Sequence, residues 1–223
     1  MKNKLLILLC CIAFIGCKKE ETSESVTVNY EVGDRFIYLN ELSYFYDDTT
    51  ALNADSSSYS LDSTYLWVEK DTTINGTACK KVIRTNWLGF VSIDYIAKKS
   101  DGNYYIASRS SSGGELSLYP EPELEYPANM NLGTHWGTTP DGKNRRNEVI
   151  GNATVSTAAG KFNCVSVKYN IYPDDFIFNV NDQFIVYISN KGLVKLEINS
   201  FSTVDYEDKH GKQFSSIKMY RIE

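Results

Sequence analysis

Cysteine and histidine side chains offer the most specific chemistry in this sequence, and they are few and scattered. The 223 residues include five cysteines and two histidines, His135 and His210. Catalytic and metal sites need several such groups together, yet the sequence contains no nucleophile elbow, zinc-protease motif, phosphate-binding loop or dinucleotide fingerprint. We therefore expect no enzyme, no cofactor and no metal site. A hydrolytic triad assembled across the fold is the remaining enzymatic alternative.

Cys79 and Cys164 are the cysteines that lie beyond the first 17 residues. In an oxidising compartment they could form a disulfide, and closure of so wide a loop would stabilise the protein by about 4–5 kcal/mol. The alternative is two separate buried thiols, because the sequence does not place their Cα atoms within bridging distance.

The first 17 residues have the pattern of an export signal. Lys2 and Lys4 precede the apolar run Leu5–Ile15, and Gly16 and Cys17 follow it. The run is long enough for a signal core but too short to span about 30 Å of hydrocarbon. Cys17 stands where the apolar run meets a polar, charged segment. We therefore expect residues 1–16 to be a signal peptide.

The four residues Phe14-Ile15-Gly16-Cys17 resemble the lipobox of bacterial lipoproteins. The resemblance implies cleavage after Gly16 and acylation of Cys17 by fatty acids such as palmitate, which would anchor the mature chain to a membrane. A lipoprotein carries two or three chains, and these hold more firmly than the single chain that binds only reversibly. The alternative is an ordinary cleaved signal peptide with an incidental cysteine.

The charge of the chain argues against a nucleic-acid partner. The formal net charge is −5, and removal of Lys2 and Lys4 with the signal lowers it to −7. Binding to phosphates needs a basic stripe, whereas the basic residues here cluster only in pairs such as Lys80-Lys81 and Arg145-Arg146. We expect no nucleic-acid binding.

The rest of the chain predicts a flexible tether over residues 17–29 and one mostly β, antiparallel domain over residues 30–223. Short runs of β-branched and aromatic residues are separated by turn residues, with Asn75-Gly76 and Asp101-Gly102 typical of tight hairpins. Prolines keep the segment Leu118–Ala128 extended but outside the centre of a sheet. The last strand, Ser215–Ile222, has no clearly apolar face, which suggests an edge position.

Aromatic residues are the best candidates for a ligand pocket. The chain contains 16 tyrosines, 10 phenylalanines and 3 tryptophans, and most of these must fill the core. Trp67, Trp87 and Trp136 are our candidates for the lining of a pocket.

The C-terminal half contains motifs that resemble those of uncharacterised Bacteroidota envelope lipoproteins. The motifs are Gly133-Thr134-His135-Trp136, a V-x-T-x-A-G-x-F turn at residues 155–162, and a G-L-V-K-x-E strand at residues 192–197. The resemblance implies a single, strongly curved antiparallel sheet, an open half-barrel or barrel-like fold similar to that of lipoprotein-carrier proteins. It implies no catalytic residue.

Three short segments resemble the acceptor sequences of Bacteroidota O-glycosylation. Each contains Asp followed by Ser or Thr, and the acceptors would be Thr49, Ser63 and Thr72. Such short patterns also arise by chance in a chain rich in these residues.

Taken together, these features predict a lipoprotein of the cell envelope, at the outer membrane, whose periplasmic or surface face is undetermined. Our leading hypothesis is a non-enzymatic binding module that holds an apolar or amphipathic ligand in the concavity of its sheet. The alternative is a surface interaction protein or glycan-binding protein with a filled β core.

Overall fold

The computed structural model describes residues 25–48, 58–85, 90–110, 114–138, 145–169, 183–206 and 209–223. Cys17, Thr49 and Trp87 therefore lie outside the described residues. Within this part of the chain there is no helix of the length and apolar character that crossing a membrane requires.

Twelve β-strands make up the described fold. In chain order they are β1 (Arg35–Asp48), β2 (Ser58–Ile74), β3 (Thr77–Thr85), β4 (Val91–Lys99), β5 (Gly102–Ser110), β6 (Ser117–Pro127), β7 (His135–Thr138), β8 (Arg145–Thr157), β9 (Gly160–Tyr169), β10 (Gln183–Ser189), β11 (Gly192–Tyr206) and β12 (Lys209–Arg221).

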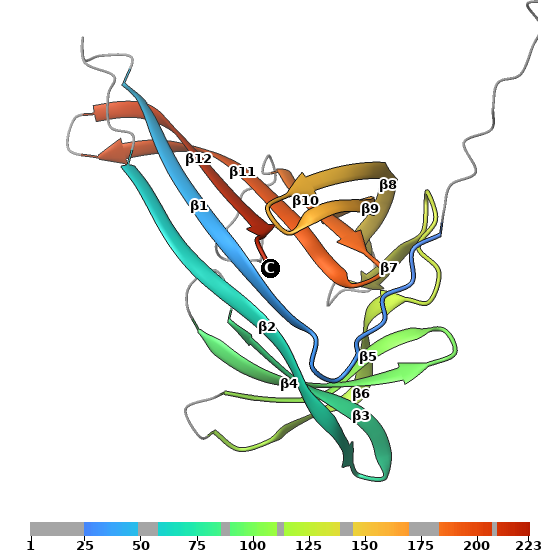
Figure 1. Ribbon diagram of the computed structural model, residues 1–223. Helices are drawn as coiled ribbons and strands as arrows, with labels where there is room; N and C mark the ends of the chain where they lie inside the picture. Colours follow the sequence, from blue (N-terminus) through green and yellow to red (C-terminus); the bar gives the residue numbers. More distant parts are fainter. Residues whose placement is uncertain are drawn as a thin grey trace, which may run out of the picture.

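All twelve strands belong to one antiparallel sheet that curves until it is nearly a closed barrel (Figure 1). The chain meanders from β1 to β6, crosses to β7 and meanders back to β12, which pairs with β1. The sheet therefore ends at β6 and β7, and the barrel has one unsealed seam between them. The prediction of a single, strongly curved antiparallel sheet is confirmed.

The turn residues act as the sequence predicts. Asn75 and Gly76 join β2 to β3 with φ angles of 48° and 81°, and Gly102 begins β5 with a φ of 156°. A side chain at Gly102 would collide with the backbone of Tyr126 and with Leu124 on β6. Glycine is therefore required there so that β5 and β6 can approach each other closely.

The sequence predicted the position of β6 in the sheet correctly and that of the last strand, β12, wrongly. The proline-containing β6 is indeed a terminal strand of the sheet. The prediction that the last strand lies at an edge is wrong, because β12 pairs with β1 on one side and β11 on the other. Its polar inward residue, Arg221, is accommodated by stacking on Phe36, with 3.8 Å from the guanidinium carbon to the ring centroid.

The segment before β1 crosses one end of the barrel and points alternate side chains into the core, so the predicted tether ends earlier than residue 29. Val26 and Val28 are buried, and they belong to the main core cluster together with Tyr30. The backbone nitrogen of Asn29 donates to the carbonyl of Asn190 over 2.9 Å. Figure 1 shows this segment in blue, between the green strands and the orange strands. The physical reason is that the nearly closed sheet leaves interior space that its own side chains do not fill.

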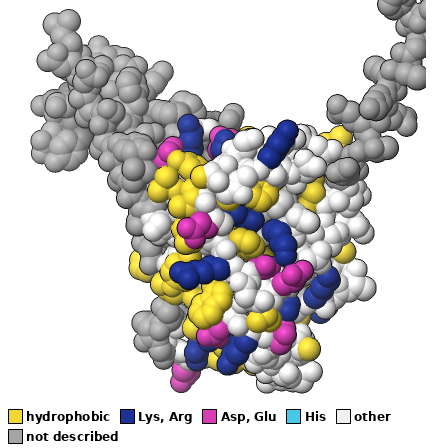
Figure 2. Space-filling model, viewed as in Figure 1, with side chains coloured by type: hydrophobic (Ala, Val, Ile, Leu, Met, Phe, Trp, Pro, Cys, Tyr) yellow, Lys and Arg dark blue, Asp and Glu magenta, His cyan; other side chains and the backbone are white. Residues whose placement is uncertain are grey.

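Within the described part of the chain, buried side chains form three core clusters. The main cluster fills the barrel and includes Met130, Val82 and Val165. Cys79 belongs to a second cluster around β4, and Cys164 belongs to a third with Val155 and Val194. On the face shown in Figure 2, basic, acidic and apolar side chains are interspersed, without a stripe of one charge.

Replacing Met130 by alanine tests how strongly the segment before β1 is held. Met130 is fully buried and its backbone pairs with that of Val26. Because the substitution leaves a cavity, we expect Met130→Ala to lower the free energy of unfolding by about 2–5 kcal/mol. Leu132→Ala, at a side chain that is 65% exposed, is the matched control and should change it by less than about 0.5 kcal/mol. Urea denaturation measures the free energy of unfolding of both variants, and equal losses would contradict the burial of Met130 against the N-terminal segment.

Candidate functional site

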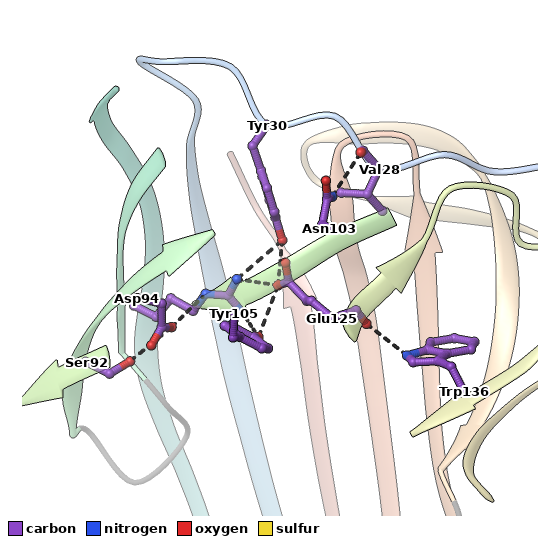
Figure 3. Close-up of polar contacts among 9 residues, drawn as sticks. Val28, Tyr30, Ser92, Asp94, Asn103, Tyr105, Glu125 and Trp136 are labelled. Carbon is purple, nitrogen blue, oxygen red and sulfur yellow. Dashed lines mark hydrogen bonds and ion pairs between the residues drawn. The ribbon is translucent and has the colours of Figure 1, made fainter. Parts of the chain in front are cut away.

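A buried cluster of charged and phenolic side chains occupies the interior of the barrel (Figure 3). Arg84 comes from β3, Asp94 from β4, Tyr105 from β5 and Glu125 from β6, while Tyr30 comes from the segment before β1. The cluster therefore links four neighbouring strands to the N-terminal segment. We refer to these five residues as the Arg84 cluster.

The guanidinium of Arg84 is the centre of the cluster. One of its terminal nitrogens, Nη2, forms an ion pair with Oε1 of Glu125, and Nη1 donates to the hydroxyl of Tyr105 over 3.0 Å. Its Nε lies 3.3 Å from Oδ2 of Asp94. The hydroxyls of Tyr30 and Tyr105 donate to Oε1 of Glu125 over 3.0 and 3.1 Å. Each charged group thus has an opposite charge in contact, which a buried ion needs.

Hydrogen bonds from two side chains to backbone carbonyls hold the segments that carry this cluster in place. The indole nitrogen of Trp136 on β7 donates to the carbonyl of Glu125 on β6 over 2.9 Å. This hydrogen bond crosses the unsealed seam. The side-chain amide of Asn103 donates to the carbonyl of Val28 over 3.1 Å, which fixes the N-terminal segment close to Tyr30. Figure 3 shows both contacts.

Burial shifts the proton equilibria of the cluster. It raises the pKa of the Tyr30 and Tyr105 hydroxyls well above the usual range, so both remain proton donors. For Arg84, burial lowers the pKa, but Glu125 and the other partners raise it further, so the guanidinium stays charged. Burial also raises the pKa of the Asp94 carboxyl, against the opposing effect of Arg84. The Arg84 cluster therefore contains one basic group, the guanidinium of Arg84, and two carboxyl groups, those of Asp94 and Glu125.

Among the described residues, several buried side chains retain polar atoms without a hydrogen-bond partner. They include Oε2 of Glu125, Nε of Arg221 and both amide atoms of Asn40, a β1 residue that is 6% exposed. Asn40 is the second residue after Tyr38 on β1, and it lies opposite Met219 on β12. Unpartnered buried polar atoms are uncommon in proteins and call for an explanation, such as a bound molecule.

A pocket of about 240 Å³ lies beside the Arg84 cluster inside the barrel. Leu66, Leu193 and Met219 give it apolar walls, and Arg84 and Tyr38 contribute polar groups. The hydroxyl of Tyr38 donates to the carbonyl of Leu193 over 3.1 Å, so its oxygen can still accept a hydrogen bond. Mostly apolar walls with a few fixed polar groups are typical of small-molecule sites.

A larger and more polar groove of about 660 Å³ lies at a different place. Three asparagines contribute to it, Asn152, Asn163 and Asn190, together with Lys161 and Phe162. Amide groups and an aromatic ring are groups that can bind polar ligands such as sugars.

Of the predicted tryptophans, the structure describes Trp67 and Trp136, and these two occupy different environments. Trp136 is buried and binds the backbone of Glu125, whereas Trp67 is 38% exposed and neighbours the buried Leu66 and Val68 on β2. Neither residue lines the pocket beside Arg84.

The other predicted site residues are not members of the Arg84 cluster. Cys79 and Cys164 are free thiols in separate core clusters. Of the glycosylation candidates, Ser63 is exposed and Thr72 is half-buried on β2. His135 is exposed, with Nδ1 2.9 Å from the carbonyl oxygen of Gly133. Among the described residues, no group of three or more His, Cys, Asp or Glu side chains is arranged to hold a metal ion.

The Arg84 cluster was missed by reasoning from the sequence. A signal was present, because Arg84 and Asp94 alternate with the buried residues Val82 and Ile96 on their strands. Alternation places such residues on the inner face. A charged residue at an inward position therefore needs an interior partner.

Comparison with known proteins identifies no family. No protein-family model matches the chain, and no curated protein matches it. A protein of Bacteroides fragilis, proposed to be exported and described as having a YmcC-like fold, is 15% identical, with 90% of this chain and 99% of that one covered and a TM-score of 0.36. A proposed lipoprotein of Parabacteroides distasonis is 16% identical, with 86% and 97% covered and a TM-score of 0.27.

Removal of the Glu125 carboxylate should strongly destabilise the protein. Glu125→Ala leaves Asp94 as the one carboxyl group in contact with the Arg84 guanidinium, and it leaves the hydroxyls of Tyr30 and Tyr105 without their acceptor. Breaking a buried ion pair in this way costs about 3–5 kcal/mol. Glu123→Ala, at an exposed position two residues earlier on β6, is the control. Chemical denaturation should separate the two variants by several kcal/mol, and a loss of less than about 1 kcal/mol for Glu125→Ala would contradict the buried pair.

The raised pKa of Asp94 predicts a pH dependence of stability. The unfolded chain releases this proton near pH 4, below the native pKa, so the native protein loses stability as the pH rises from about 4 through the native pKa. Asp94→Asn does not titrate. The free energy of unfolding of Asp94→Asn, relative to wild type, should therefore increase between acidic and neutral pH. Urea titrations at a series of pH values measure it, and a difference that is constant or falls with pH would refute the shift.

Proposed function

We propose that this protein is a non-enzymatic lipoprotein of the cell envelope that binds a small amphipathic molecule inside its barrel. The pocket beside the Arg84 cluster is the observation that carries the binding proposal. It combines apolar walls with buried polar groups that are already oriented by other contacts. Acylated Cys17 would hold the barrel at the membrane, on the basis of the lipobox-like sequence.

The charges around the pocket indicate which head group it favours. Arg84 lines the pocket, but its charge is compensated by Glu125 and Asp94. A strongly anionic head group would meet these two carboxyl groups close behind the guanidinium. A neutral head group with hydroxyl or amide groups could instead bond with the Tyr38 oxygen and the edge of the guanidinium. We therefore propose a neutral amphiphile rather than a fatty acid.

The volume of the pocket limits the size of this ligand. About 240 Å³ is slightly below the usual range of small-molecule pockets. The pocket would accept a small head group or one short chain, not a complete phospholipid. Affinity would come mainly from burial of apolar surface, at about 25 cal/mol per Å².

Native mass spectrometry of the protein purified from its own membrane tests this function. We expect a bound amphiphile in wild type, and binding weakened by at least about tenfold in Met219→Trp, because the larger side chain fills the pocket. Val32→Trp places the same side chain at a position that is 49% exposed and should bind like wild type. A wild-type protein that is empty and takes up neither monoacylglycerol nor alkyl glycoside on titration would refute the proposal.

A second candidate function is recognition of a polar ligand such as a glycan. The groove that contains Asn152, Asn163 and Asn190 favours it, because amide groups form paired hydrogen bonds with hydroxyls. Oligosaccharide binding that is lost in Asn163→Ala but retained in Met219→Trp would support this alternative and place the ligand outside the barrel.

A further inference from the structure

Two exposed apolar side chains come from neighbouring segments at the corner of the barrel where β7 begins: one from the turn before β7 and one from β8. Leu132 is 65% exposed, and Ile150 is 44% exposed. The turn that carries Leu132 is tied to β8 by two backbone hydrogen bonds of 2.8 Å, from the nitrogen of Gly133 to the carbonyl of Val149 and from the nitrogen of Val149 to the carbonyl of Thr134. Ile150 directly follows Val149. We refer to these two side chains as the Leu132–Ile150 patch.

The N-terminal segment enters the barrel at the same corner. Val26 and Met130 exchange backbone hydrogen bonds of 3.4 and 3.0 Å, and the hydroxyl of Ser25 donates to the side chain of Asn129 over 3.3 Å. Leu132 follows Met130 by two residues. In Figure 1 the yellow-green loop between β6 and β7 lies beside the first described residues of the blue segment.

The length of the chain before Ser25 keeps this corner close to Cys17. Only residues 18–24 lie between Cys17 and Ser25. A fully extended chain of this length reaches at most about 28 Å. Wherever Cys17 is held, the Leu132–Ile150 patch is confined to its neighbourhood, and this raises its effective concentration at any surface there.

We propose that the Leu132–Ile150 patch docks on the lipid bilayer that holds Cys17. This inference rests on the proposed acylation of Cys17. The lipid chains would supply the anchor, and the two side chains would enter the acyl boundary and fix the orientation of the barrel. Beside the patch, Glu148 on β8 lies in register between His135 on β7 and Lys168 on β9, and all three are exposed, so one acidic group balances one basic group there. Docking is therefore apolar and insensitive to salt.

The test places an environment-sensitive nitrobenzoxadiazole dye on Leu132→Cys, Ile150→Cys or Leu118→Cys in the acylated full-length protein. The protein is purified from membranes and reconstituted in vesicles of phosphatidylethanolamine and phosphatidylglycerol. Leu118 is the matched control, because it is 46% exposed but lies near the opposite end of β6 from the corner. The native Cys79 and Cys164 are buried, and burial raises the pKa of the Cys164 thiol to about 11, so the exposed new cysteine reacts first. A Cys79→Ser, Cys164→Ser background repeats the measurement without them.

We expect a blue shift and a several-fold rise in emission at positions 132 and 150, with quenching by spin-labelled lipid, and no change at position 118. The signal should persist in high salt. Unchanged emission at positions 132 and 150, in protein that floats with the vesicles, would overturn the docking and leave the anchor intact. Equal shifts at all three positions would also overturn it. An N-terminal peptide whose mass shows no acyl chains would overturn both the anchor and the docking that depends on it.

Discussion

The ion pair between Arg84 and Glu125 is the contact on which the interior of this barrel depends. Both groups lie where a nearly closed sheet excludes most water, and the side chain of Glu125 is only 3% exposed. An unpaired charge in such a place is costly, so the strands that carry these residues must keep their positions. The pair therefore fixes the relation of β3 to β6. The tyrosines add the N-terminal segment to the same arrangement, because Tyr30 donates to the same carboxylate oxygen.

Arg221 shows a second solution to the same constraint. Its guanidinium stacks on Phe36 and donates to the carbonyls of Lys191 and Leu193 over 3.0 and 2.6 Å. Here the charge is satisfied by backbone dipoles and an aromatic face rather than by a carboxylate. Among the described residues, the barrel thus holds the guanidinium groups of Arg84 and Arg221 with different partners. Of the two, Arg84 also lines the interior pocket, which is why its surroundings matter for ligand choice.

The sequence predicted the local features of the fold well, because they depend on neighbouring residues. Asn75-Gly76 and Asp101-Gly102 mark hairpins through backbone conformations that few other residues adopt. The position of β12 was predicted wrongly because Arg221 reads as a surface residue until its partners are known. Those partners come from β1 and the turn after β10, which no local pattern connects to it.

The candidate site was harder to predict than the fold for the same reason. Tryptophan content suggested a pocket, but which face of a strand a tryptophan occupies depends on register, and Trp67 and Trp136 differ in exposure. The Arg84 cluster gathers residues from five separate segments. Inward alternation was a signal that could have placed Arg84 and Asp94 in the interior, whereas the pairing of Arg84 with Glu125 follows only from the three-dimensional arrangement of the sheet.

The placement of the N-terminal segment also sets an order of events for folding. Tyr30 and Glu125 are separated by 95 residues, and Ser25 and Asn129 by 104. Contacts of such long range are slow to form, since large loops must close before any of them stabilises the chain. Asn29 must in addition wait for Asn190. The first part of the domain to emerge during synthesis is therefore among the last to be completed, and the chain beside Cys17 stays without its interior partners until most of the sheet exists.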